Sequence, residues 1–330
     1  MNIERDDKSR DLSLAQNEGF IRFQFLKVRF ILVPVEPIIL PPYKGSTLRG
    51  AFGHAFRKVV CIVKDKDCVD CLLRSRCAYS YIFETPTPEG TSRMKKYPYV
   101  PHPFVITPPL QDKRVYKPEE ELSFSLTLIG RAAEYLPYFI YTFEELGRRG
   151  IGKGKGRYRL LRVEDGKERV IYQAEDKGLR GDYTSLSWLQ ILRMKGELGP
   201  QELTLRFLTP TRLKFNGRFT SQLEFHILIR NLLRRISLLA YFHCGIELDL
   251  DFREIIDGAK SVEKRDDRLR WYDWERYSRR QDVRLKMGGI VGEVSFVGEL
   301  GEFLPFLLLG EQIHVGKGTS FGLGKYEIVR

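Results

Sequence analysis

The sequence predicts an α+β protein built from two tandem ferredoxin-like (RRM-like) domains, each with the element order βαββαβ. One segment occurs twice at an offset of 168 residues: Tyr135–Ile140 (YLPYFI) matches Phe303–Leu308 (FLPFLL), and Gly154–Tyr158 (GKGRY) matches Gly322–Tyr326 (GLGKY). Each copy is typical of an apolar helix, a glycine-rich basic loop and a strand. Because the offset is close to half of the 330 residues, we expect two copies of one fold.

In the first half, apolar residues alternate at strand spacing or recur at helical spacing. The expected elements are a strand over 20–35, a helix over 48–60, a strand over 121–129, a helix over 133–146 and a strand over 157–163. Ser46 or Thr47 is expected to cap the first helix, because a hydroxyl there can accept a hydrogen bond from a free backbone N–H. Residues 61–103 are expected to form a cysteine-containing insertion.

The second half repeats this order. The expected elements are a strand over 202–208, a helix over 220–243, strands over 268–278 and 283–298, a helix over 302–313 and a strand over 325–329. We therefore predict a flexible tail over 1–19, an N-terminal domain over 20–175 and a C-terminal domain over 200–330. The polar residues 165–200 are expected to connect the two domains.

The composition is that of a soluble globular protein with an excess of positive charge. Lys and Arg number 55 against 43 Asp and Glu, which gives a net charge of +12 and favours a polyanionic partner. No segment approaches the roughly 18 apolar residues of a membrane-spanning helix. Because residues 1–19 also lack an apolar signal segment, we expect a cytoplasmic protein that does not enter a membrane.

The two glycine-rich loops, 147–159 and 316–325, combine glycine with Lys and Arg. Glycine lets a backbone N–H turn toward a phosphate without a Cβ in the way, and the cations neutralise it. The alternative is an ordinary helix-to-strand turn with incidental charge. Neither loop has the context of a nucleotide-binding motif, so a pair of them favours an extended nucleic-acid backbone.

The residues predicted to contact RNA lie mainly in and around these loops. They are Lys44, Arg49, Arg149, Lys153, Lys155, Arg157, Arg230, Arg234, His314, Gly316, Lys317, Gly318, Gly322, Gly324 and Lys325. Segment 268–280 (RLRWYDWERYSRR) adds aromatic rings among arginines, which could stack unpaired bases or simply pack as strands.

Three segments together resemble a known family: Pro42–Gly53 (PYKGSTLRGAFG), the cysteine cluster that ends at Cys77, and Gly316–Gly324 (GKGTSFGLG). They are similar to the CRISPR-associated RAMP endoribonucleases that process precursor guide RNA, the Cas-six family, and most closely to its longer branch with a cysteine cluster. The resemblance spans roughly residues 20–330. It implies two ferredoxin-like domains, binding of CRISPR repeat RNA, possible association with other effector subunits, and cleavage that needs no metal.

Metal-free RNA cleavage uses the 2′-OH of the substrate as nucleophile and leaves a 2′,3′-cyclic phosphate and a 5′-OH. It needs a group that moves protons and a cation that stabilises the charged phosphorane. His54 suits the first task and Lys58, four residues later on the same helix face, the second, with Tyr43 as a proton donor or orienting group. A structural histidine is the competing interpretation of His54, and His314 is the rival candidate.

The cysteine cluster consists of Cys61, Cys68, Cys71 and Cys77, with the spacing C-x6-C-x2-C-x5-C. Four thiolates at this spacing can hold a structural zinc ion. Only one CxxC pair is present, so four reduced thiols without metal are the alternative. No cofactor is expected for catalysis.

Two functions are consistent with these observations. The first is a metal-independent endoribonuclease specific for CRISPR repeat RNA. The second is a non-catalytic RAMP subunit that holds guide RNA within an effector complex. Cleavage in the presence of a chelator distinguishes them.

Overall fold

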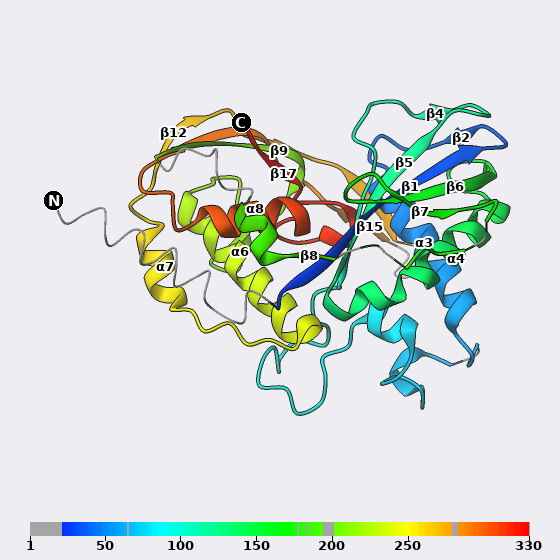
Figure 1. Cartoon of the computed structure of the whole chain (residues 1–330). Coiled ribbons are helices and arrows are strands. Elements are labelled where there is room, and N and C mark those ends of the chain that lie inside the picture. Colours follow the sequence, from blue (N-terminus) through cyan, green and yellow to red (C-terminus); the bar gives the residue numbers. More distant parts are fainter. Residues whose placement is uncertain are drawn as a thin grey trace. The chain divides into compact units, whose positions relative to one another are not determined.

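The computed structural model describes residues 22–64, 66–176, 178–181, 183, 185–193, 201–278 and 283–329 (Figure 1). The predicted tail over 1–19 lies outside these residues. The chain forms two compact units, an N-terminal unit over Phe25–Ser185 and a C-terminal unit over Leu186–Arg330 that also includes the chain up to Gln24.

The N-terminal unit is an antiparallel sheet with the strand order β3-β5-β1-β6-β7. Its strands are β1 (Gln24–Pro34), β3 (Phe104–Thr107), β5 (Leu122–Ile129), β6 (Tyr158–Asp165) and β7 (Val170–Gln173). Helices α3 (Gly45–Val60) and α4 (Leu136–Arg149) cover one face of this sheet (Figure 1). Short strands β2 (Ile38–Ile39) and β4 (Val115–Tyr116) pair beside it.

An aromatic core joins these helices to the sheet. The ring of Phe52 on α3 stacks on Phe139 of α4 at 4.5 Å, and Phe143 of α4 lies 5.0 Å from Phe30 of β1. All four side chains are fully buried. Because each ring buries a large apolar area, this cluster fixes α3 and α4 against the strands.

The C-terminal unit has the strand order β12-β16-β9-β17. Its main elements are β9 (Glu202–Thr211), α6 (Phe225–Leu239), β12 (Glu263–Asp267), β16 (Gly289–Val297), α8 (Leu304–Ile313) and β17 (Tyr326–Val329). In both units the first and third core strands are central and the fourth lies beside the first. The prediction of two ferredoxin-like domains is confirmed.

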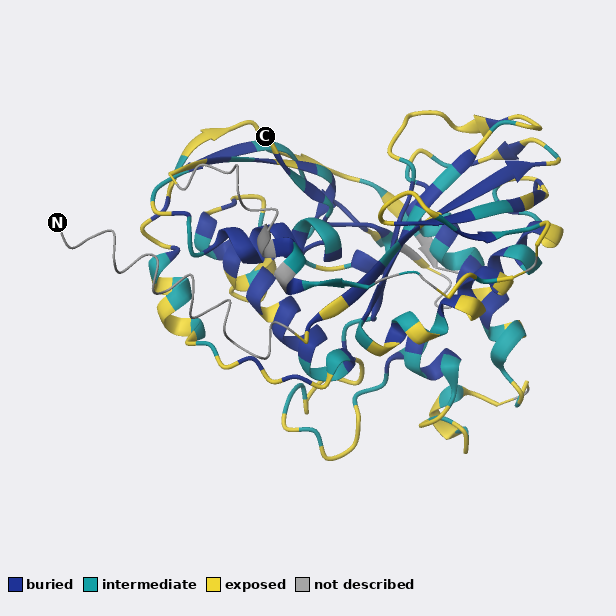
Figure 2. Ribbon diagram, viewed as in Figure 1, coloured by how far each residue is buried: buried dark blue, intermediate teal, exposed yellow. Residues whose placement is uncertain are grey.

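The remaining elements are short. They are β8 (Leu186–Ser187), α5 (Trp188–Arg193), β10 (Lys214–Phe215), β11 (Arg218–Phe219), α7 (Phe252–Gly258), β13 (Arg270–Tyr272), β14 (Glu275–Ser278), β15 (Val283–Lys286), and single helical turns at Cys68–Asp70, Ser80–Glu84, Gly130–Tyr135, Ala240–Cys244 and Thr319–Phe321. Figure 2 shows that exposed residues gather at the hairpins and turns, while strands and inward helix faces are buried.

Three local predictions were wrong. Helix α3 begins at Gly45 with Lys44 as its N-cap, and no side chain caps it, so Ser46 and Thr47 lie inside the first turn. The connection predicted over 165–200 contains β7, which pairs with β6. The two strands predicted between 268 and 298 are divided, because β14 and β15 form a separate hairpin before β16.

Candidate functional site

The two glycine-rich loops share one backbone path. Helix α4 is followed by Gly150 at φ 75° and ψ 162°, and helix α8 by His314 at φ 62° and ψ 170°. Each loop then closes with a backbone hydrogen bond of 3.0 Å, from Ile151 N to Gly156 O and from Val315 N to Gly324 O. The loops are therefore structural equivalents, as the repeat predicts.

The gap-free offset of 168 residues does not hold through the loops. Equivalence of Gly150 with His314 gives an offset of 164, whereas Gly156 and Gly324 are 168 apart. Helix α4 has 14 residues and α8 has 10, so α8 is shorter by about one turn. The second loop is longer than the first by four residues, which offsets the shorter helix, and the extra residues form the turn around Thr319–Phe321.

The glycines are needed for close backbone packing. A Cβ on Gly152 would lie 2.3 Å from the carbonyl oxygen of Ile39, and one on Gly324 would lie 1.8 Å from that of Val315. The backbone N–H groups of Lys153 and Lys317 donate inward, to carbonyl oxygens of neighbouring strands or turns. The expectation that these loop N–H groups turn toward a ligand was wrong for both lysines.

Of the residues predicted to contact RNA from the first loop, Arg149, Lys153 and Lys155 are exposed. Arg157 is different, because its Nε and Nη2 donate to Oε1 of Glu36 at 2.9 and 2.7 Å. These hydrogen bonds lower the pKa of Glu36 and raise that of Arg157. Arg157 is therefore paired with a carboxylate at the surface, and its contact with RNA stays a prediction.

The second loop lies within a cluster of cations that we call the basic cluster: Lys214, Arg234 and Lys317. All three side chains are exposed. The residue Lys317 is exposed as a whole, but partial desolvation of its ammonium group lowers its pKa, and the charges of Arg234 and Lys214 lower it further. A bound anion would stabilise the charged form of Lys317, because it would offset the two neighbouring positive charges.

Other residues of the C-terminal unit that were predicted to contact RNA are less exposed to solvent. His314 is 2% exposed and its Nδ1 contacts Leu323 O at 3.1 Å, so its ring holds the loop from inside. Gly322 and Gly324 are buried, while Gly316 and Gly318 are partly exposed. Burial therefore excludes His314 from direct contact with RNA in this structure.

Lys325 and Arg230 lie at the edges of this surface. Lys325 is partly exposed, and burial is the main reason that its pKa is lowered. Arg230 is exposed on α6, and its charge helps to lower the pKa of Asp257 on α7. Contact of either side chain with RNA stays a prediction.

A buried arginine that sequence reasoning did not assign supports the second loop. Arg235 Nε donates to the carbonyl oxygens of Ile313 and His314 at 3.1 and 3.0 Å, and Nη2 donates to Ile313 at 2.8 Å. Burial lowers the pKa of Arg235 to about 9. The apolar stripe of α6 gives no sign of this role, because the acceptors come from a segment 78 residues away.

Replacing Arg235 by methionine should lower the free energy of unfolding of the C-terminal unit by about 2 kcal/mol, because two buried carbonyls lose their donor. All three tryptophans belong to this unit, so their fluorescence during urea unfolding reports its stability. The exposed neighbour Arg234 provides the matched control, Arg234→Met, which should change stability by less than about 0.5 kcal/mol. Equal effects at the two positions would contradict this role.

The predicted catalytic residues lie on or before α3. His54 and Lys58 are both exposed and one turn apart, so they share the solvent face of the helix. Tyr43 lies two residues before α3, and the helix rises by about 14 Å along its axis from Gly45 to His54. Burial raises the pKa of Tyr43, so its hydroxyl stays protonated.

Two basic residues near the start of α3 have structural contacts. Lys44 is 2% exposed and its Nζ donates to Gln111 O at 2.6 Å, which excludes it from contact with RNA in this structure. Arg49 is partly exposed, with its guanidinium 3.9 Å from the ring centroid of Phe83 and its Nη2 3.3 Å from Nε2 of His102. Arg49 is thus held in one orientation.

The cysteine cluster does not have the geometry of a metal site. Among the described residues, no group of three or more His, Cys, Asp or Glu side chains could hold a metal ion. The Sγ of Cys61 donates to Val63 O at 3.1 Å, and burial raises the pKa of Cys68, which favours the protonated form of that thiol. The structural zinc ion that the spacing suggested is therefore not supported.

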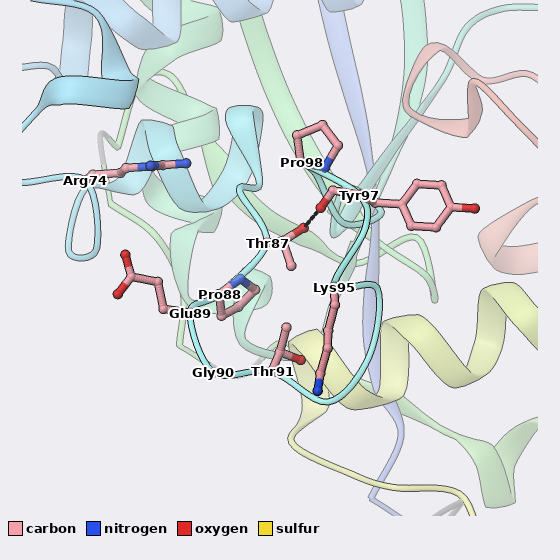
Figure 3. Close-up of a pocket in the computed structure, with 9 residues that line it drawn as sticks. All are labelled: Arg74, Thr87, Pro88, Glu89, Gly90, Thr91, Lys95, Tyr97 and Pro98. Atoms are coloured by element: carbon pink, nitrogen blue, oxygen red, sulfur yellow. Dashed lines mark hydrogen bonds between the residues drawn. The ribbon is translucent and has the colours of Figure 1, made fainter.

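The insertion contains a shallow pocket of about 490 Å³ (Figure 3). It is lined by Arg74, Thr87, Pro88, Glu89, Gly90, Thr91, Lys95, Tyr97 and Pro98. Thr87 bonds the backbone of Tyr97 across its floor, and the Tyr97 ring points away from the hollow. None of the predicted catalytic or RNA-contacting residues lines it.

Of the helices in the described part of the chain, none combines the length and the apolar character that a membrane crossing requires.

Two family models match the chain. Residues 23–184 match one described as an N-terminal domain, and residues 205–326 match that of the CRISPR-associated endoribonuclease Cas6. An uncharacterized protein of Archaeoglobus fulgidus is 26% identical over 294 residues, which is 88% of this chain and 92% of the relative.

Solved structures share the fold across both units. A Cas6 (TTHB231) product complex has a TM-score of 0.56 at 18% identity and covers 93% of this chain and 99% of that chain. Thermus thermophilus Cas6 (TTHB231) gives 0.53 at 16% identity, with the same coverage. A partial Cas6-RT-Cas1–Cas2 complex gives 0.59 at 12% identity, covering 93% of this chain and 46% of that one.

Proposed function

We propose that this chain, a member of the Cas6 family of CRISPR-associated endoribonucleases, binds CRISPR repeat RNA and cleaves precursor guide RNA within each repeat. One observation carries the proposal. The part of the chain that matches the family, residues 205–326, contains the second glycine-rich loop and the whole basic cluster of Lys214, Arg234 and Lys317. The pKa of Lys317 is lowered by desolvation and then by the charges of Arg234 and Lys214, and cations gathered in this way are suited to a phosphate backbone.

The proposed reaction needs no metal ion. The 2′-OH next to the scissile phosphate attacks phosphorus, the bond to the 5′-oxygen breaks, and the products carry a 2′,3′-cyclic phosphate and a 5′-OH. His54 accepts the proton of the 2′-OH or protonates the departing 5′-oxygen, and the Lys58 ammonium stabilises the phosphorane. The exposed shared face of these two side chains on α3 supports this assignment. Tyr43, which precedes the same helix, is proposed as the proton donor or orienting group that complements His54.

The test is incubation of the purified protein with the repeat RNA encoded nearest its gene, with and without EDTA. We expect equal cleavage under both conditions. The upstream fragment should resist phosphatase until acid opens the cyclic phosphate, and the downstream fragment should accept phosphate from a kinase directly. Tight binding without cleavage would favour the non-catalytic RAMP subunit, and cleavage abolished by EDTA would exclude the proposed chemistry.

The proposed partners are repeat RNA and other CRISPR-associated subunits. A solved Cas6-RT-Cas1–Cas2 complex contains a part with this fold, which supports the second suggestion. Co-purification of the tagged chain from its own cells, before and after ribonuclease treatment, would separate direct protein partners from those joined through RNA.

A further inference from the structure

The two glycine-rich loops differ at one equivalent position. Lys153 N donates to Ile39 O at 2.9 Å in the N-terminal unit, and Lys317 N donates to Arg212 O at 3.0 Å in the C-terminal unit. Ile39 and Arg212 therefore occupy the same place beside their loops. An aliphatic side chain stands at one and a guanidinium at the other.

Arg212 is a half-buried cation without an acidic partner among the described residues. Its Nη1 contacts the Met287 sulfur at 3.1 Å, its guanidinium lies 4.3 Å from the ring centroid of Phe219, and its buried Nε has no hydrogen-bond partner there. Burial alone lowers its pKa. A desolvated charge with a free donor is costly unless an anion approaches it.

Arg276 repeats this arrangement at Phe321, a residue of the second loop. Its guanidinium lies 4.4 Å from the ring centroid of Phe321, its buried Nε also lacks a partner within the described residues, and burial alone lowers its pKa. Both arginines contact the same small neighbourhood. Phe321 N donates to Gly318 O at 3.0 Å, and a Cβ on Gly318 would lie 3.5 Å from the methyl group of Met287.

We propose that the duplicated loops have diverged, so that Arg212 and Arg276 hold a phosphodiester of single-stranded RNA at the second loop while the first loop is mainly a structural turn. Guanidinium groups present several N–H donors in a plane, which matches phosphate oxygens. The rings of Phe219 and Phe321 hold both groups in place and offer π-faces to an adjoining base. In the first loop, Ile39 supplies no charge and Arg157 is neutralised by Glu36.

This inference rests on the proposed function only in taking RNA as the ligand. Its test is therefore binding of a 20-nucleotide single-stranded uridylate RNA, which requires no cleavage, measured by fluorescence anisotropy from low to high salt. Each phosphate contact with a single strand contributes about 0.7 to the slope of log K against log salt. The double variant Arg212→Gln, Arg276→Gln should reduce that slope by about 1.4 and weaken binding at least about tenfold.

The matched variant removes two charges from the first loop, Lys153→Gln with Lys155→Gln. It should change the slope by less than half as much. An equal or larger effect of this variant, or an unchanged slope for the arginine variant, would overturn the inference. Should the double arginine variant unfold, each single variant is expected to lower the slope by about 0.7. If the salt slopes change as expected but the protein does not cleave repeat RNA, the proposed reaction is rejected while the different roles of the two loops still hold.

Discussion

Replacing His54 by glutamine is expected to slow cleavage of repeat RNA by about 10²- to 10⁴-fold, with affinity for the RNA within about twofold of the original protein. The imidazole is exposed on α3, so the change creates no cavity and should leave folding intact. A proton-transfer group acts in the reaction step, and therefore its loss lowers the single-turnover rate and spares binding. Single-turnover cleavage and an anisotropy titration with a 2′-deoxy substrate separate the two effects.

The control is His226→Gln, which changes a partly exposed histidine of α6 that contacts the ring of Phe215 at 5.6 Å. It should cleave at close to the original rate. An unchanged rate in the His54 variant would remove the proposed proton-transfer group and leave the function without its chemistry. A loss of RNA affinity as large as the loss of rate would instead assign His54 to substrate binding.

The patterns of local sequence predicted most of the fold. Alternation and helical spacing placed β1, β5, β6, β9, β16, β17 and the four main helices, because each of these elements buries one face in the core of its unit. They missed the edge strands β3 and β12. They failed where a boundary depends on contacts from distant residues. Lys44 occupies the N-cap position of α3, and its ammonium group donates to the carbonyl oxygen of Gln111, 67 residues away, which the composition of the first turn does not indicate.

The site was predicted less completely for the same reason. The sequence alone suggests that a basic residue in a glycine-rich loop can bind a phosphate. Arg157, however, is paired with Glu36, which is 121 residues away in the chain. Conversely, Arg212 ends a strand and carries no motif, so only its place beside Lys317 and its unpartnered Nε identify it. Local pattern shows where cations are. Tertiary packing decides which of them retain unbalanced charge.

The repeat itself shows what an alignment without gaps conceals. The Leu-Pro segments that begin α4 and α8 match at 168 residues, yet the helix ends match at 164. The hydroxyl of Tyr158 donates to Phe143 O, and that of Tyr326 donates to Leu307 O. The two acceptor residues are also 164 residues apart, although the two tyrosines are 168 apart. Sequence similarity therefore follows the helix starts, while packing against the final strand follows the helix ends.

Replacing Gly324 by alanine is expected to lower the free energy of unfolding of the C-terminal unit by about 3–5 kcal/mol. At φ 74° an L-residue is already strained, and the new methyl group would lie 1.8 Å from Val315 O, a backbone atom that cannot rotate away. Relief requires opening the hydrogen bond from Val315 N to Gly324 O, which closes the loop. Urea unfolding followed by tryptophan fluorescence measures the loss within this unit.

Gly245→Ala is the matched control, because Gly245 also has a positive φ of 66° but has no neighbouring atom within 4 Å of the added Cβ. Only the conformational strain of about 1–2 kcal/mol should remain there. The comparison separates two explanations of the glycine pattern. If the role of Gly324 is to admit a phosphate, its alanine variant should lose no more stability than Gly245→Ala and should lose RNA affinity. If it exists to admit the Val315 carbonyl, as the geometry indicates, stability falls first, and affinity falls because the loop that carries Lys317 has lost its shape.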